Sequence, residues 1–170
     1  SLIDHLEWQL NLTPMAPTDR VIAMAIIDAI DTDGMLGTSI EEIRTTLFDP
    51  HLTKDEQVND EDVIQILGRL QQFDPIGVGA RDLRECLLLQ LMQLDPATPW
   101  LEETISVVDQ HLDLLGAKDF VNLIKRTRLQ EFQLSEIVTL IRTLQPRPGA
   151  AFDSADSDFL FQRFRRTHNF

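Results

Sequence analysis

Residues 73–91 read Phe-Asp-Pro-Ile-Gly-Val-Gly-Ala-Arg-Asp-Leu-Arg-Glu-Cys-Leu-Leu-Leu-Gln-Leu, and this stretch decides how the chain is organised. Its first half contains Pro75, Gly77 and Gly79, which interrupt helices and favour tight turns. Its second half predicts a helix over about residues 81–94 that is apolar on nearly all sides. A helix of that kind is usually packed on two sides. We therefore expect it to lie at the centre of the molecule and to join two halves.

The segments on either side of this stretch also predict helices. Apolar residues recur at intervals of three and four, and we find no convincing alternation of apolar and polar residues that would indicate a strand. The predicted helices begin near Ser1, Thr18 and Ser39 and then cover about residues 60–72, 81–94, 98–116, 118–127 and 131–144. The predicted fold class is all-α, with two small helical bundles, of about four helices and then three, joined through the central apolar helix. The predicted domains are residues 1–95 and 96–149, followed by a mobile tail over residues 150–170.

The charge of the chain favours a protein partner. Its 170 residues carry 15 Lys and Arg against 28 Asp and Glu, a net charge of −13, and residues 1–71 alone hold 14 acidic and 4 basic residues. Nucleic-acid binders usually carry a basic surface, because their affinity comes from neutralising phosphates. An acidic surface instead attracts a basic patch on a partner protein.

Several kinds of chemistry are not expected. The single cysteine, Cys86, excludes a disulfide framework and a multi-cysteine zinc site, and the four histidines are far apart in the sequence. The Gly77–Gly79 turn lacks the third glycine of a dinucleotide-binding motif. No metal, cofactor or catalytic site is therefore predicted. The longest apolar run, residues 21–27, is far shorter than the roughly 20 residues of a membrane helix. With no export signal, we expect a cytoplasmic protein that has no contact with a membrane.

One segment allows a different interpretation. Residues 118–147 carry 6 basic and 3 acidic residues and predict a helix, a short turn and a second helix. A helix-turn-helix would place the start of the second helix against DNA, where Glu131 and Glu136 would oppose phosphates. We favour an ordinary helical hairpin, and a helical DNA-binding domain using residues 118–147 stays as the alternative.

The stretch 73–91 resembles the signature region of the enhancer-dependent bacterial sigma factors, the sigma-fifty-four or nitrogen-limitation family. Further resemblances occur in the same order along the chain, at residues 1–14, 26–36, 98–103 and 140–149. The resemblance covers about residues 1–149 and fades beyond Gly149. Several long motifs in the right order make it far more specific than any one short pattern.

The resemblance implies that the chain is the core-binding region of such a sigma factor. Two helical subdomains would bind core RNA polymerase, near the flap of the beta subunit, and would serve promoter-specific transcription initiation. An activator ATPase would hydrolyse the ATP, so the chain itself would not be an enzyme. Contacts with that activator and with promoter DNA would be made through parts of the full factor that are absent here.

Two sets of residues are predicted to carry the function. The candidate polymerase contacts are Asp60, Glu61, Asp62, Asp74, Pro75, Gly77, Val78, Gly79, Arg81 and Asp82. For the loop residues among them, an interface role and a purely structural role stay open. Pro146, Arg147, Pro148 and Gly149 are predicted to form a turn that sets the exit direction of a linker.

Overall fold

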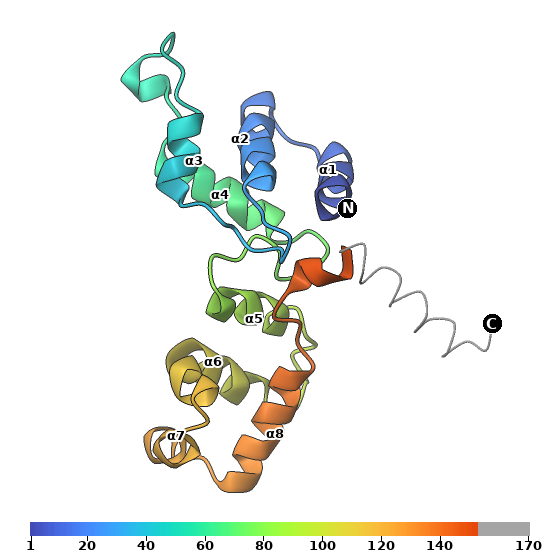
Figure 1. The fold of residues 1–170 in the computed structure, drawn as a ribbon, viewed down its shortest axis with the longest axis vertical. Helices are drawn as coiled ribbons and strands as arrows, with labels where there is room; N and C mark the ends of the chain where they lie inside the picture. The colour runs from blue at the N-terminus through green and yellow to red at the C-terminus, as the bar shows by residue number, and fades with distance from the viewer. Residues whose placement is uncertain (153–170) are drawn as a thin grey trace, which may run out of the picture. The chain divides into compact units, whose positions relative to one another are not determined.

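The computed structural model describes residues 1–152, in which helices joined by loops make up the fold (Figure 1). Its α-helices are α1 (Leu2–Asn11), α2 (Pro17–Asp28), α3 (Ile40–Thr46), α4 (Asp60–Leu70), α5 (Leu83–Leu91), α6 (Leu101–Gly116), α7 (Phe120–Thr127) and α8 (Glu131–Arg142). Two short 3-10 helices, η1 (Lys54–Glu56) and η2 (Pro148–Phe152), complete the set. Within the described residues the only β-pairing is two isolated bridges, Ile30 with Leu36 and Met35 with Ala80. The all-α prediction is confirmed.

The described chain divides into two compact units. Unit 1 comprises Ser1–Arg81 and the C-terminal segment that starts at Arg147, and unit 2 comprises Asp82–Pro146. The boundary therefore differs from the predicted one at residue 95, and α5 is the first helix of unit 2. Its buried Leu87 and Leu91 form an apolar cluster with Val108 of α6, which places it with the helices that follow. Unit 2 is thus inserted into unit 1 and has a chain connection at each end.

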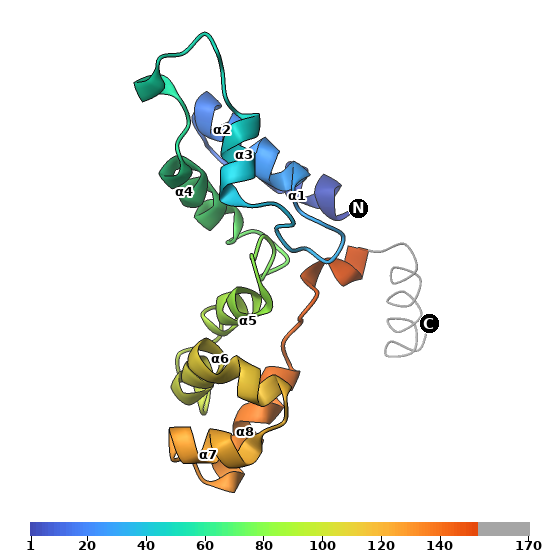
Figure 2. The ribbon, with the colours of Figure 1, turned by 60° about the vertical axis from the view of Figure 1, so that its left-hand side comes forward.

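Unit 1 contains α1 to α4 (Figure 2). Their buried apolar residues form one core. The core-facing residues recur at helical spacing, as in Leu2, Leu6 and Leu10 of α1, which are all buried. Reciprocal side-chain caps begin two of these helices. Ser1 and Asp4 cap α1, and Asn59 and Asp62 cap α4 in the same way.

Unit 2 has two adjoining apolar clusters, in both of which α6 takes part. The helix α6 begins after Trp100, whose φ of 65° is left-handed, and not at Thr98 as the sequence suggested. Thr98 instead donates its hydroxyl to the carbonyl of Asp95 at 2.6 Å and stabilises the preceding turn.

The only cysteine belongs to the interior of unit 2. Cys86 is buried on α5, where the amide of Gln90 lies 3.4 Å from its sulfur. Burial raises the pKa of the Cys86 thiol, because a thiolate is poorly solvated there. The Cys86 thiol therefore has the properties of an inert core thiol.

Among residues 1–152, no helix has both the length and the apolar character needed to span a membrane.

Candidate functional site

The acidic cluster at the start of α4 consists of Asp60, Glu61 and Asp62. Carboxylates are favoured there by the positive end of the helix dipole. Two of the three also have structural partners. Asp60 forms an ion pair with Arg44 of α3, with 2.9 Å between Oδ1 and Nε, and Asp62 accepts the Asn59 backbone N–H at 3.0 Å. Glu61 is exposed and has no ion pair or side-chain hydrogen bond within residues 1–152, so it is the carboxylate best placed to meet a partner.

A shallow groove of about 400 Å³ lies next to this cluster, lined by Arg44, Thr45, Phe48, Lys54, Gln57, Val58 and Asn59. The Phe48 side chain is 65% exposed, although aromatic side chains are usually at least half buried. Residues 41–62 hold eight acidic and two basic residues. We call residues 41–62 the α3–α4 surface. It combines exposed apolar area with strong negative charge.

The loop of residues 73–82 belongs to unit 1 except for its last residue, and hydrogen bonds hold it to that unit. Its Asp74 backbone exchanges two hydrogen bonds with the side chain of Gln9, at 2.8 and 2.6 Å, and the Asp74 carboxylate lies 2.8 Å from His5 Nε2. The Asp74–Pro75 peptide bond is cis. The Gly79 N–H donates to the carbonyl of Gly34 at 2.8 Å. The loop is therefore an integral part of the unit.

The candidate contacts in this loop fall into two groups. Val78 is only 1% exposed, and Gly77 and Gly79 have φ angles of 101° and 77°, so these three residues shape the turn. Arg81 and the side chain of Asp74 are exposed. Asp82 is also exposed, and its carboxylate accepts the Glu85 N–H at 2.8 Å as the N-cap of α5. The loop follows the C-terminal end of α4, so it and the acidic cluster lie at opposite ends of that helix.

Residues 147–149 of the predicted exit turn contact other parts of unit 1, and the role of Pro146–Gly149 in directing a linker stays a prediction. Pro148 and Gly149 are buried, and the Gly149 N–H donates to the carbonyl of Asp33 at 2.8 Å. The guanidinium of Arg147 contacts Oδ1 of Asp33 through Nε and Nη2, at 2.9 and 2.8 Å. We call residues 147–152 the anchor segment, because they attach the end of the described chain to unit 1.

The predicted tail of residues 150–170 begins inside this anchor segment. Residues 150–152 belong to η2, and the ring of Phe152 stacks on that of His5 with 5.1 Å between centroids. This part of the predicted tail is packed, contrary to expectation. The prediction for residues 153–170 lies outside the described residues.

The α7–α8 hairpin gives the DNA-binding alternative no support. The exposed Glu131 and Phe132 occupy the first turn of α8, the position from which a recognition helix reads bases. At that position the carboxylate of Glu131 would repel DNA phosphates, and the ring of Phe132 has no group that binds them.

Among residues 1–152, no group of three or more His, Cys, Asp or Glu side chains could hold a metal ion.

The described chain is helical, divides into two units and exposes several large apolar side chains, among them Phe48 and Phe132. The profile of the family described as "Sigma-54 factor, core binding domain" matches residues 1–162, and the chain belongs to this family. The resemblance predicted from residues 73–91 is therefore confirmed. The match also continues beyond Gly149, where the sequence motifs alone suggested that it fades.

Curated relatives agree with this assignment. The chain is 48% identical over 160 residues to the RNA polymerase sigma-54 factor of Pseudomonas aeruginosa, covering 94% of this chain and 31% of the relative. For the factor of Azotobacter vinelandii the identity is 49% with the same coverage, and for that of Escherichia coli it is 44%, covering 94% of this chain and 32% of the relative. The chain thus spans about a third of the length of these relatives.

Proposed function

We propose that this chain docks an enhancer-dependent sigma factor onto core RNA polymerase in the bacterial cytoplasm and thereby serves promoter-specific transcription initiation. The observation that carries the proposal is the core-binding-domain match, which extends over both units. The chain contributes binding and no reaction. Contacts with the activator ATPase and with promoter DNA belong to other parts of the factor.

The α3–α4 surface is the part of unit 1 that we propose to meet the polymerase, on a basic patch near the flap of the beta subunit. Its charge is the main support, because unit 1 carries most of the negative charge of the chain. Exposed Phe48 supplies apolar area beside the carboxylates. The polar residues Asp74, Arg81 and Asp82 form a second candidate contact, and Pro75, Gly77, Val78 and Gly79 give that loop its shape.

A direct binding measurement tests the proposal. The fluorescently labelled chain is titrated with purified core polymerase free of sigma factors, and complex formation is followed by fluorescence polarisation and on native gels. We expect a saturable complex with a dissociation constant at or below about 1 μM, as for a specific interface of ordinary size. No complex at polymerase concentrations about tenfold higher would contradict the proposal.

Reversing the charge of Glu61 separates docking from folding. We expect Glu61→Lys to slow association with core polymerase at low salt by about fivefold, because opposite charges steer the encounter. The cost in folding free energy is expected to stay below about 1 kcal/mol, the usual size of an exposed helix-dipole effect. Stopped-flow association rates at two salt concentrations and urea unfolding measure the two effects.

Glu102→Lys is the matched control. Glu102 is exposed in the first turn of α6 and occupies the second helical position, as Glu61 does in α4. Both changes therefore alter net charge and helix dipole equally, but only one lies on the α3–α4 surface. Equal association rates for the two variants would show that this surface is not used.

A further inference from the structure

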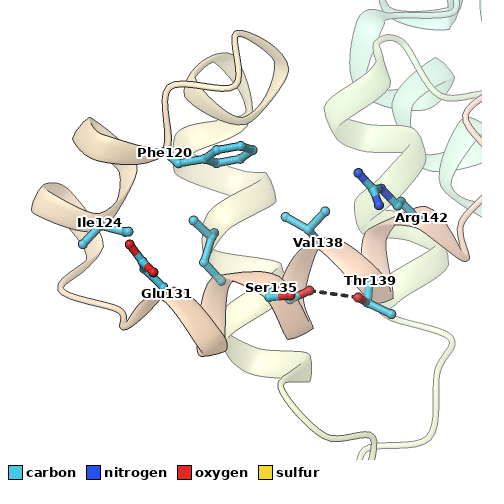
Figure 3. A pocket seen from close by; sticks show the side chains of 8 residues that line it. Phe120, Ile124, Glu131, Ser135, Val138, Thr139 and Arg142 are labelled. Carbon is cyan, nitrogen blue, oxygen red and sulfur yellow. Dashed lines mark hydrogen bonds between the residues drawn. The ribbon is translucent and has the colours of Figure 1, made fainter.

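A second groove, with apolar and polar residues in its lining, lies in unit 2 between α7 and α8 (Figure 3). It has a volume of about 360 Å³ and is lined by Phe120, Ile124, Glu131, Leu134, Ser135, Val138, Thr139 and Arg142. The two helices each pack on α6, which leaves the space between them open. Phe120 is 41% exposed at the groove, and the neighbouring Val121 is 67% exposed. Apolar side chains exposed in this way favour a binding partner.

The α8 side of the groove is a stripe with opposite charges at its two ends. Glu131, Ser135, Val138 and Arg142 follow one another at intervals of four, three and four residues, so they share one face of the helix. Figure 3 shows Glu131 at one end of the groove and Arg142 at the other. Arg142 has no ion pair within the described part of the chain, so its charge is available to a partner.

The surroundings of the groove are basic, unlike the rest of the chain. Residues 118–142 hold five basic and three acidic residues, although the whole chain has a net charge of −13. The basic residues are Lys118, Lys125, Arg126, Arg128 and Arg142, and none is within ion-pairing distance of an acidic group in residues 1–152. An acidic partner is therefore attracted to this hairpin and repelled by unit 1.

We propose that the α7–α8 groove is the docking site for an acidic amphipathic helix of a partner protein. The occupant would place apolar side chains spaced i, i+3, i+4 and i+7 against Phe120, Ile124 and Val138, as helices bound in grooves do. Its carboxylates would face Arg142 and Lys125. The short side chains of Ser135 and Thr139 allow a helix backbone to approach closely. Nucleic acid fits this groove less well, because four of the eight lining residues are apolar and Glu131 is among the others.

A designed peptide tests the inference without any assumption about polymerase. The probe is a fluorescein-labelled helix of about 16 residues, stapled because isolated helices of that length are marginal in water. It has Leu at the four anchor positions and Glu on both flanks. The controls are the same peptide with Lys in place of Glu and a labelled DNA duplex of about 20 base pairs, long enough for a hairpin footprint. Fluorescence polarisation with the full chain measures binding, and amide chemical shifts locate it.

Two charge-reversal variants, Arg142→Glu and Arg126→Glu, show which side of α7–α8 the peptide contacts. We expect the acidic peptide to bind with a dissociation constant of about 1–100 μM, and Arg142→Glu to weaken it about tenfold or more. Arg126→Glu carries the same charge change, but Arg126 lies two residues beyond Ile124 and faces the opposite side of α7. Its effect should be about threefold or less, the size of a distant charge effect.

The inference is wrong if the acidic and basic peptides bind equally, if the duplex binds more tightly, or if no peptide binding occurs at about 1 mM. It is also wrong if the amide chemical shifts change only at residues outside α7 and α8. Equal losses of peptide affinity for the two arginine variants would contradict it as well. Urea unfolding of both variants confirms that a lost signal reports the groove and not the fold. Arg142 is exposed and makes no hydrogen bond through its side chain within the described residues, so Arg142→Glu should fold like the parent chain. Arg126 is also exposed, but after the hydrogen bonds from Asn122 its charge helps to lower the pKa of Asp119, the N-cap of α7, so the unfolding measurement is needed most for Arg126→Glu.

Discussion

Replacing Gly149 with alanine is expected to lower the free energy of unfolding of unit 1 by about 2–3 kcal/mol, at the upper end of ordinary single substitutions. A Cβ atom on Gly149 would lie 2.7 Å from the backbone nitrogen of Gly34 and 2.8 Å from the carbonyl carbon of Asp33. Real Cβ atoms do not approach backbone so closely, and backbone gives way less easily than a side chain. The anchor segment must therefore shift, and its hydrogen bond to Asp33 is lost.

The matched control for this change is Gly68→Ala. Gly68 lies in α4, and an added Cβ would meet nothing within 4 Å. Alanine is better than glycine in a helix by about 1 kcal/mol, so this variant should be more stable than the parent. Urea unfolding gives both free energies, and hydrogen exchange at the Gly149 amide reports the anchor directly. If Gly149→Ala keeps that amide protected and the stability unchanged, the close packing of the anchor segment is wrong.

Truncating Leu67 to alanine should have an equally large effect. We expect the free energy of unfolding to fall by about 3 kcal/mol, within the usual range of 2–5 kcal/mol for buried leucines. Leu67 is 1% exposed in the centre of the unit 1 core. Its Cδ1 also lies 3.4 Å from the position of a Cβ built on Gly79, so it supports the loop of residues 73–82. The lost free energy of unfolding combines the transfer free energy of the removed methyl groups with the energetic cost of the cavity that they leave.

The location of this loss is as informative as its size. Units 1 and 2 have separate apolar clusters, so amides of α2 and α4 should exchange faster in Leu67→Ala while those of α6 and α8 stay as protected as in the parent. Leu12→Ala is the control, because Leu12 is exposed at the end of α1 and should cost less than about 0.5 kcal/mol. Equal loss of protection in both units would contradict the division into two cores.

Much of the secondary structure could be predicted from the sequence. The predicted ranges place α4 and α8 with the correct first residue, and α3 begins directly after Ser39, whose hydroxyl accepts the Glu42 N–H at 3.1 Å. These features depend on neighbours within one or two helical turns. The predicted start of α6 is wrong because Trp100 adopts a left-handed backbone conformation, which a tryptophan does not signal in advance.

The domain boundary and the anchor segment depend on contacts that the sequence does not display. Asp33 and Arg147 are 114 residues apart, and periodicity has no means of pairing them. The same limit applies to the candidate site. The sequence predicts the acidic cluster of α4, but only the structure shows that Asp60 and Asp62 have partners while Glu61 does not. Likewise, an apolar residue between two glycines can face solvent or the core, and Val78 faces the core.

This chain should bind core polymerase without the rest of the factor, and a competition experiment shows whether it does. Core polymerase is first saturated with a fluorescently labelled intact sigma-54 factor, and the unlabelled chain is then added in increasing amounts. We expect the chain to displace the intact factor in a saturable manner, with Glu61→Lys requiring a higher concentration than Glu102→Lys. If the intact factor stays bound at every concentration of the chain, up to about a hundredfold excess over the polymerase, the docking account is contradicted.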